Sequence, residues 1–203
     1  MLMDKQDQIL DAAARRFALY GFRRTVLDDI ARDAGIGKGS IYLHVPGKDE
    51  LFIQTVRREQ RLMVEAAREA TAGQSPRAAI QALVLRMLKW LDERPLMGRL
   101  MTGDPELGMG PDLGRQAGQA CHDERLLYDH ISELLARGVE EGLFRGDLSP
   151  EAAVTLIISI FHIYLHNKRQ HFIELDDEVF VAELLRILFE GILICERGTH
   201  GAK

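Results

Sequence analysis

The feature that most constrains the fold is the spacing of apolar residues, which recur three and four positions apart along almost the whole chain. This is the period of an α-helix that buries one face. Alternating runs typical of strands are absent, and the 203 residues include only 6 prolines. With 46% hydrophobic and 28% charged residues, the composition is that of a globular protein. The sequence therefore predicts an all-α fold.

Glycine and proline divide the pattern into helices. A first helix is predicted from Lys5 to Tyr20, ended by Gly21, and a second, short one begins near Leu27 with Thr25 as its N-cap. Later helices are predicted over 37–45, 48–72, 76–94, 112–141, 150–171 and 176–196. Between them, residues 95–111 contain four glycines and three prolines, so this segment is expected to hold at most a short helix and a mobile loop.

Charge is unevenly distributed along the chain. The whole chain carries a formal net charge of -5, but residues 15–48 carry +4 and the remainder -9. A small basic region joined to an acidic body is typical of a nucleic-acid reader whose other part has a different task. We therefore expect a DNA-binding domain over residues 1–47 and a second helical domain over 48–203.

Residues 27–45 have the pattern of a helix, a tight turn and a second helix. Ala31 supplies a small side chain where the two helices would cross, and Gly35 suits a turn that needs positive φ. The second helix of such a unit can lie in the major groove of DNA. Its solvent-facing side chains would be those of Ser40, Tyr42, Leu43 and His44.

A set of short motifs spans Ile9 to Phe52. They are the Ala-Ala and Phe of the first helix, Gly21-Phe22, Thr25, Ile30-Ala31, Ala34-Gly35, Gly39-Ser40-Ile41-Tyr42, His44 and Lys48-Asp49-Glu50-Leu51. In these residues the chain resembles the DNA-binding head of the TetR family of bacterial transcriptional regulators. The resemblance implies an N-terminal three-helix helix-turn-helix head followed by a larger helical domain for ligand binding and dimerisation.

The resemblance also implies which residues meet DNA. The backbone would be contacted by Thr25, Tyr42 and Lys48, while base edges or phosphates would be read from the positions of Lys38, Gly39, Ser40, Leu43 and His44. The residue types agree, since a tyrosine hydroxyl can bind a phosphate and a leucine can meet a thymine methyl group. Two residues depart from the family pattern: Val26 stands where many members have Ser or Thr, and Val45 stands where Phe is more frequent. Both differences concern packing and remove no DNA contact. The alternative is a small helical hairpin that buries Tyr42 in a core.

The last two predicted helices are apolar on more than one face, so each needs a second burial partner. A homodimer with a four-helix interface supplies it and predicts a near-palindromic operator. The remaining body would enclose a small-molecule pocket, with residues 95–111 as its entrance. Its candidate lining is Met63, Met87, Trp90, Met97, Met101, Cys121, Arg125, Tyr128, Phe161 and His162, although such residues at helical spacing also suit a plain core.

Other classes of function have weaker support. The chain lacks a Gly-x-Ser-x-Gly elbow, a phosphate-binding glycine loop and a His-Glu-x-x-His motif, so we expect no enzyme. His162 and His166 could hold a metal, but such pairs are more often surface histidines, and neither metal nor cofactor is expected. Two cysteines and no secretory signal favour the cytoplasm. The leading hypothesis is a homodimeric repressor released from DNA by a small ligand; the alternative is a DNA-bound scaffold that acts through a protein partner.

Overall fold

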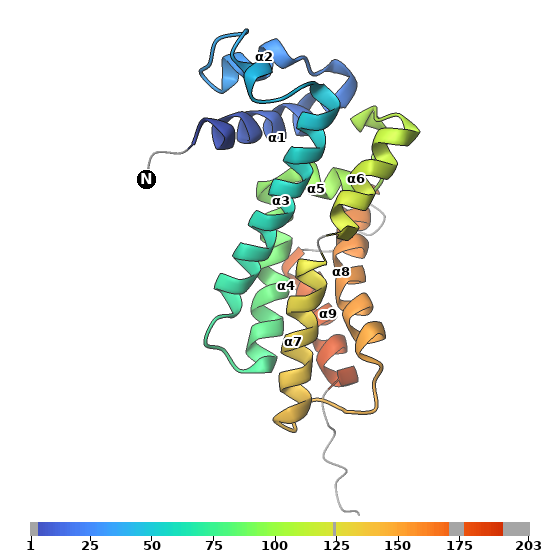
Figure 1. Ribbon diagram of the computed structural model, residues 1–203. Coiled ribbons are helices and arrows are strands. Elements are labelled where there is room, and N and C mark those ends of the chain that lie inside the picture. Colours follow the sequence, from blue (N-terminus) through green and yellow to red (C-terminus); the bar gives the residue numbers. More distant parts are fainter. Residues whose placement is uncertain (1–3, 124, 171–176, 193–203) are drawn as a thin grey trace, which may run out of the picture. The chain divides into compact units, whose positions relative to one another are not determined.

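The computed structural model describes the backbone of residues 4–123, 125–170 and 177–192, and their side chains except at 121–123, 169–170, 177–178 and 192. Within these ranges every regular element is a helix, which confirms the all-α prediction (Figure 1). The elements are α1 (Lys5–Arg24), α2 (Leu27–Asp33), the 3₁₀-helix η1 (Ile41–Leu43), α3 (Lys48–Thr71), α4 (Pro76–Glu93), α5 (Pro95–Met101), the 3₁₀-helix η2 (Pro105–Leu107), α6 (Pro111–Asp123), α7 (Leu126–Glu140), α8 (Pro150–Gln170) and α9 (Asp177–Ile192).

Three of the predicted helices differ from those in the structure. The first helix continues to Arg24, but it bends at Gly21, whose φ is +76°. The helix expected over 37–45 is reduced to η1 and the turns beside it, because Gly37 and Gly39 disfavour a full helical turn. The single helix expected over 112–141 is two helices, α6 and α7, and no glycine or proline marks the break in the sequence.

The chain packs into two compact units. One consists of Met1–Ala66 with Met87–Leu126, and the other of Ala67–Arg86 with Leu127–Lys203. Helices α3 and α4 therefore contribute residues to both units. Because these units are defined by packing, the division of the chain by function after Gly47 remains a prediction.

An aromatic cluster forms the core of the first unit near the end of α1. The ring of Phe52 stands edge-on to Phe17 and Phe22, with centroids 5.0 and 5.5 Å apart. In the segment expected to contain a mobile loop, Leu96 of α5 and Leu107 of η2 are fully buried. This segment therefore adds two short helical elements to the first unit, where the sequence predicted one short helix and a loop.

Buried and half-buried charges join α1 to α3 and to the start of α5. Arg94 donates to both carboxylate oxygens of the buried Glu59 and to Asp11, which also accepts from Arg58. Burial alone would raise the pKa of Asp11, but the hydrogen bonds from Arg58 and Arg94 outweigh it and hold the pKa below 3.8. Because Glu59 is 1% exposed, loss of Arg94 would leave a buried charge unpaired.

The second unit is built mainly from α7, α8 and α9. Its buried side chains include those of Ile131, Leu134, Ile157, Phe161, Leu185 and Phe189. Arg77 of α4 lies over the Phe189 ring, 5.2 Å from its centroid. Among the described residues, no helix combines the length and apolar character needed to cross a membrane.

Candidate nucleic-acid interface

The η1 turn exposes two large side chains. Ile41 is fully buried and fixes the turn on the head, whereas Tyr42 is 58% exposed and Leu43 is 86% exposed. Backbone hydrogen bonds from Leu43 to Ser40 (3.1 Å) and from His44 to Ile41 (3.0 Å) hold the turn. The alternative of a hairpin that buries Tyr42 is therefore wrong.

A small core beneath η1 sets its orientation. Ile30, Ala31, Ile41 and Val45 are buried, while Ala34 and Ile36 in the connecting turn are half-buried. Gly35 has a φ of +69°, as expected for the tight turn, and the amide of Ile36 donates to the carbonyl of Ala31 (2.9 Å). The residues from α2 to η1 thus form a helix, a turn and a short helical turn on a packed base.

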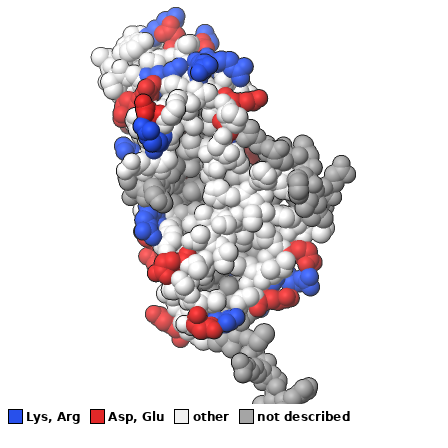
Figure 2. All heavy atoms as spheres, turned by 90° about the vertical axis from the view of Figure 1, so that its right-hand side faces the viewer, with Lys and Arg blue, Asp and Glu red and all other residues white. Residues whose placement is uncertain are grey.

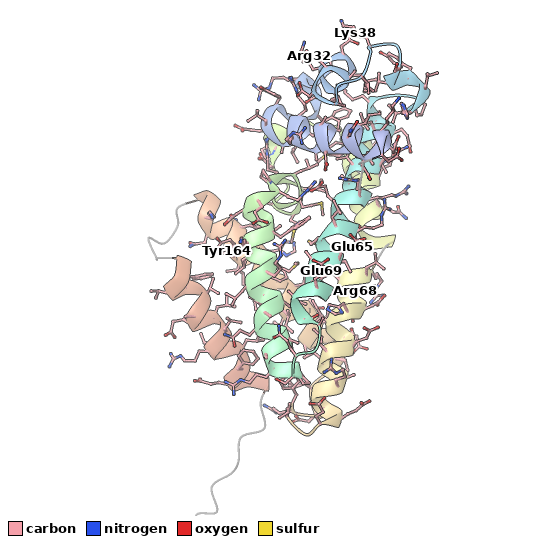
Figure 3. The ribbon with its side chains drawn as sticks, turned by 90° about the vertical axis from the view of Figure 1, so that its left-hand side faces the viewer. Arg32, Lys38, Glu65, Arg68, Glu69 and Tyr164 are labelled. Atoms are coloured by element: carbon pink, nitrogen blue, oxygen red, sulfur yellow. The ribbon has the colours of Figure 1, made fainter. Side chains whose placement is uncertain are left out.

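The remaining residues predicted to read DNA lie around η1. Lys38 and Gly39 are exposed, and Ser40 and His44 are half-buried. The ammonium of Lys38 lies 2.8 Å from a carboxylate oxygen of Asp28, and this hydrogen bond raises the pKa of Lys38. Figure 3 shows Lys38 and Arg32 at the outer end of the head. The structure therefore brings together the predicted side chains of residues 38–44.

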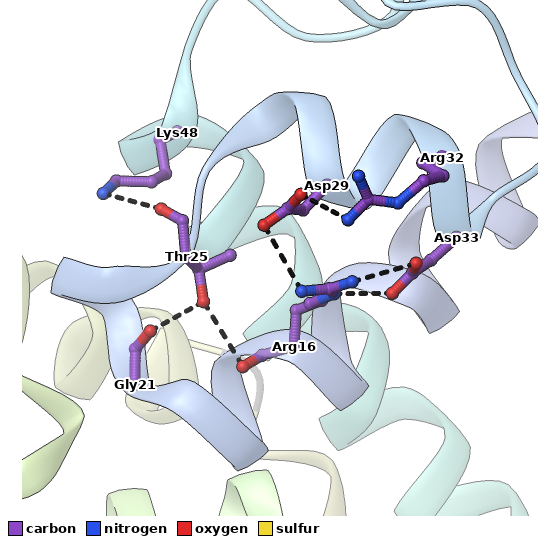
Figure 4. Close-up of polar contacts among 7 residues, drawn as sticks. All are labelled: Arg16, Gly21, Thr25, Asp29, Arg32, Asp33 and Lys48. Carbon is purple, nitrogen blue, oxygen red and sulfur yellow. Dashed lines mark hydrogen bonds and ion pairs between the residues drawn. The ribbon is translucent and has the colours of Figure 1, made fainter.

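Acidic residues of α2 neutralise much of the head's positive charge. Arg16 pairs with Asp33 (2.5 Å) and Asp29 (3.3 Å), and Arg32 pairs with Asp29 (2.5 Å) (Figure 4). Lys38 is neutralised in the same way by Asp28.

Two arginines of the head have no such neutralisation. Arg23 and Arg24 are exposed and form no ion pair within the described part of the chain. Both lie in the basic region of residues 15–48, but neither is among the residues predicted to contact DNA. Their lack of an acidic partner could have been noticed in the sequence, because the nearest acidic residue, Asp28, is four positions from Arg24.

Thr25 and Lys48 lie differently from the other predicted contacts. Thr25 is 1% exposed, and its hydroxyl donates to the carbonyl of Gly21 (2.7 Å) at the end of α1. The N-cap of α2 is Val26, so the prediction of Thr25 as that cap was wrong. The ammonium of Lys48 bonds to backbone carbonyls of the same region (Figure 4). Contact of these two residues with DNA remains a prediction.

The candidate ligand-binding residues are spread over both units. Met63, Met87, Trp90, Met97 and Phe161 are buried; Met101 and Tyr128 are half-buried; Arg125 and His162 are exposed; the side chain of Cys121 lies outside the described residues. A separate cavity of about 510 Å³ in the first unit is lined by none of the ten. Its walls include Asp11, Glu59 and Arg94. The ligand-binding assignment stays a prediction.

Helices α8 and α9 leave an apolar surface open. Leu156 and Ile163 of α8 and Val179 and Ile187 of α9 are each more than half exposed. A groove of about 530 Å³ runs between the two helices, and Leu156, Ile163 and Ile187 line it. Figure 2 views the side on which α8 lies in Figure 1 and shows few charged side chains across its middle. Both helices thus have one buried and one exposed apolar face, as the sequence predicted.

The histidine pair that the sequence singled out lies on α8. His162 and His166 are both exposed on α8, and within the described residues no group of three His, Cys, Asp or Glu side chains could hold a metal ion.

Two family models match the chain. Residues 9–55 match the model for bacterial regulatory proteins of the tetR family, and residues 76–175 match the tetracyclin repressor-like C-terminal domain. The first match contains α2, η1 and the start of α3, so it covers the geometry described above.

Individual proteins agree with the family models. The chain is 27% identical over 198 residues to the HTH-type transcriptional regulator RutR of Escherichia coli, covering 93% of this chain and 90% of RutR. The fatty acid degradation regulator FadR of Bacillus halodurans has a TM-score of 0.75 and 22% identity, covering 94% of this chain and 97% of FadR. The FadR of Bacillus subtilis in complex with stearoyl-CoA has a TM-score of 0.72 and 18% identity, covering 91% and 98%.

Proposed function

The chain belongs to the tetR family of bacterial regulatory proteins, and from this premise we propose that it is a homodimeric repressor that a small molecule releases from its operator. Its activity as a DNA-binding transcriptional regulator follows from the family. The proposal adds the oligomeric state, the direction of regulation and the release by a ligand.

The exposed η1 turn is the observation that carries the DNA-binding function on which the proposal is built. Tyr42 and Leu43 project from a backbone that is fixed by the buried Ile41, so two large side chains are presented to solvent from a packed base. Leu43 suits contact with a thymine methyl group in the major groove, and Tyr42 suits a phosphate. Lys38 would exchange Asp28 for a phosphate or a base edge.

The apolar face of α8 and α9 supports the homodimer. Side chains such as Leu156 and Ile187, each about two-thirds exposed in one chain, would be buried against the same face of a second copy. Two heads held by such a dimer can meet two half-sites about 34–36 Å apart on one side of a duplex. We therefore expect the operator to be a near-palindrome.

The effector is expected to bind in the helical body. Met63 of α3, Met87 and Trp90 of α4 and Met97 of α5 are buried apolar side chains within the first unit, and methionine adapts to irregular apolar ligands. Long-chain acyl-CoA is the first probe to test, because a structurally similar FadR was solved with stearoyl-CoA.

Contacts within the first unit offer a route from the body to the head. Arg99 of α5 donates to the carbonyl of Ala18 in α1, and it also pairs with Asp104 (2.7 Å) just before η2. A ligand that shifts α5 would therefore pull on α1 and the attached head. A hundredfold loss of operator affinity requires about 2.7 kcal/mol of coupling free energy.

The proposal makes the chain a binding protein. Its relatives are transcriptional regulators, and we expect no catalytic turnover of the effector. A regulator must reach the chromosome, so a cytoplasmic location is part of the same proposal.

The test has two stages. The purified chain is first used to select a duplex from a random pool, and the selected duplex, which is expected to be a near-palindrome, is sequenced. In a mobility-shift assay the chain should stay bound to this duplex in the presence of excess unrelated DNA. Acyl-CoAs of increasing chain length are then screened by thermal shift, and a stabilising one should release the duplex. Failure to select any sequence would contradict the DNA-binding assignment. If a sequence is selected but no small molecule releases it, the scaffold alternative is favoured.

A further inference from the structure

Lys48 is the first residue of α3, yet its ammonium group bonds to the end of α1. The Nζ atom lies 3.0 Å from the carbonyl oxygen of Phe22, 3.0 Å from that of Thr25 and 3.5 Å from that of Arg23. It also lies 4.4 Å from the centroid of the Phe22 ring. One cation therefore meets two carbonyl oxygens of the last turn of α1 and that of its C-cap residue Thr25.

Helix electrostatics explain this placement. The last carbonyls of a helix have no intrahelical partner and carry partial negative charge, so they favour a cation. A lysine at the start of a helix faces the positive end of that helix's dipole, which disfavours it. By reaching from the start of α3 to the end of α1, the Lys48 side chain exchanges an unfavourable dipole for a favourable one.

The same contacts occupy the hydrogen-bonding capacity of Lys48. An ammonium group has three N–H donors and no acceptor, and three carbonyl oxygens surround this one. To bind a phosphate, Lys48 would have to leave carbonyls that are themselves poorly supplied with donors. Lys38 differs, because its partner is a single exposed carboxylate that a phosphate can replace.

The turn that Lys48 holds determines where α2 begins. The hydroxyl of buried Thr25 donates to Gly21 on one side, and the carbonyl of Thr25 accepts from Lys48 on the other (Figure 4). Phe22 packs edge-on against Phe52 of α3, 5.5 Å away. The α1–α2 turn is thus fixed to α3 through Lys48 and Phe22, and the orientation of α2 and η1 depends on it.

We infer that Lys48 is a positioning residue for DNA recognition: it clamps the α1–α2 turn to α3 and so orients the η1 reading surface, and it does not neutralise a DNA phosphate. The inference rests on the DNA-binding function and replaces the phosphate contact predicted for this residue. Thr25, with its hydroxyl turned inward, belongs to the same clamp.

The two roles differ in salt dependence and in specificity. Removing a phosphate contact weakens specific and non-specific binding alike, and it lowers the slope of log K against log salt by about 0.9 per contact. Removing a positioning residue weakens binding to the selected sequence and leaves the slope and non-specific binding unchanged. Global destabilisation alone changes neither quantity while the chain stays folded.

The experiment compares the wild type with Lys48→Met, which keeps the aliphatic stem on Phe22 but removes the donors. Each protein is titrated with the selected duplex and with an unrelated duplex at several salt concentrations, after circular dichroism has confirmed folding. For Lys48→Met we expect an affinity loss of about tenfold or more for the selected duplex only, at unchanged slope. The matched control, Lys38→Ala, should lower the slope.

Loss of affinity for both duplexes with a lower slope would show a phosphate contact and overturn the inference. Unchanged affinity for both would overturn it as well. If the wild type itself selects no sequence, the proposed function fails, and that outcome is distinct from either result for Lys48→Met.

A second measurement needs neither DNA nor a variant. In the free wild-type chain, a limiting amount of acetic anhydride should modify Lys48 more slowly than Lys89, whose side chain is 71% exposed, as read by mass spectrometry. Equal rates would contradict the clamp. Slow modification of Lys48 before any DNA is added would support it.

Discussion

Gly21 lies directly against the backbone oxygen of Glu106, so closely that a Cβ atom on Gly21 would collide with it. The carbonyl oxygen of Leu107 would be only 3.1 Å from the same Cβ atom. Gly21 also has φ +76° and ψ 169°, a combination that is nearly restricted to glycine. The bend of α1 and the close packing of η2 against it therefore both require a residue without a Cβ atom at position 21.

Gly21→Ala should lower the free energy of unfolding by about 2 kcal/mol or more, because it adds both backbone strain and a backbone collision. Urea unfolding followed by circular dichroism would measure this. The matched control is Gly118→Ala in α6, where a Cβ atom meets nothing within 4 Å and alanine favours a helix. Equal stability of the two variants would contradict the close approach at Gly21.

Asp28 should restrain non-specific DNA binding through Lys38. Because the carboxylate holds the Lys38 ammonium at 2.8 Å, Asp28→Asn is expected to tighten binding to unrelated DNA about two- to fivefold, the range typical of an exposed pair. Fluorescence anisotropy at low salt would measure it. A double-mutant cycle with Lys38→Ala separates the pair from a general charge effect. If Asp28→Asn tightens binding equally in the Lys38→Ala background, the effect does not pass through Lys38.

Leu156→Glu or Ile187→Glu should convert the proposed dimer to a monomer. Each side chain is about two-thirds exposed in one chain, so the substitution costs little there, whereas in the proposed interface it buries an unpaired charge. Light scattering after size-exclusion chromatography should show the mass fall from two chains to one. Leu85→Glu, at a half-exposed site outside this groove, is the control and should stay dimeric. A wild type that runs as one chain would refute the interface.

His130 should make stability depend on pH below neutrality. Its Nε2 atom lies 2.9 Å from the hydroxyl of Thr71, and burial, followed by the nearby charge of Arg68 on α3 (Figure 3), lowers its pKa from 6.5, although Glu133 acts in the opposite direction. The unfolded chain therefore binds a proton at higher pH than the folded chain. The free energy of unfolding should fall as pH drops from about 6.5 toward the lowered pKa of the folded state.

The measurement is a series of urea titrations between pH 5 and 8 for the wild type and His130→Gln. The difference between the two curves should slope within this window and be flat above it. A flat difference throughout would show that His130 has the same pKa in the folded and unfolded chains.

Most helix boundaries could be read from the chain because they depend on local rules. α3 and α4 end within a few residues of the predicted positions, where glycine, serine and proline interrupt the apolar period. The break between α6 and α7 contains no such residue and the apolar spacing continues across it, so a single helix was predicted there. Helix α5 is the short helix expected within residues 95–111, but η2 was not predicted, because it depends on burial of Leu107 against residues distant in sequence.

By itself, the sequence determined the helical class and the positive φ at Gly35, since these depend on short-range periodicity and backbone preference. Only the tertiary structure decided the partners of the charged side chains. Whether Lys48 faces α1 or the solvent, and whether Lys38 is paired with Asp28, depends on which helix ends meet in the folded chain. Lys38 and Asp28 are 10 positions apart in the sequence, and Lys48 and Phe22 are 26 apart. Because these contacts form through space, the spacing of residues along the chain does not predict them.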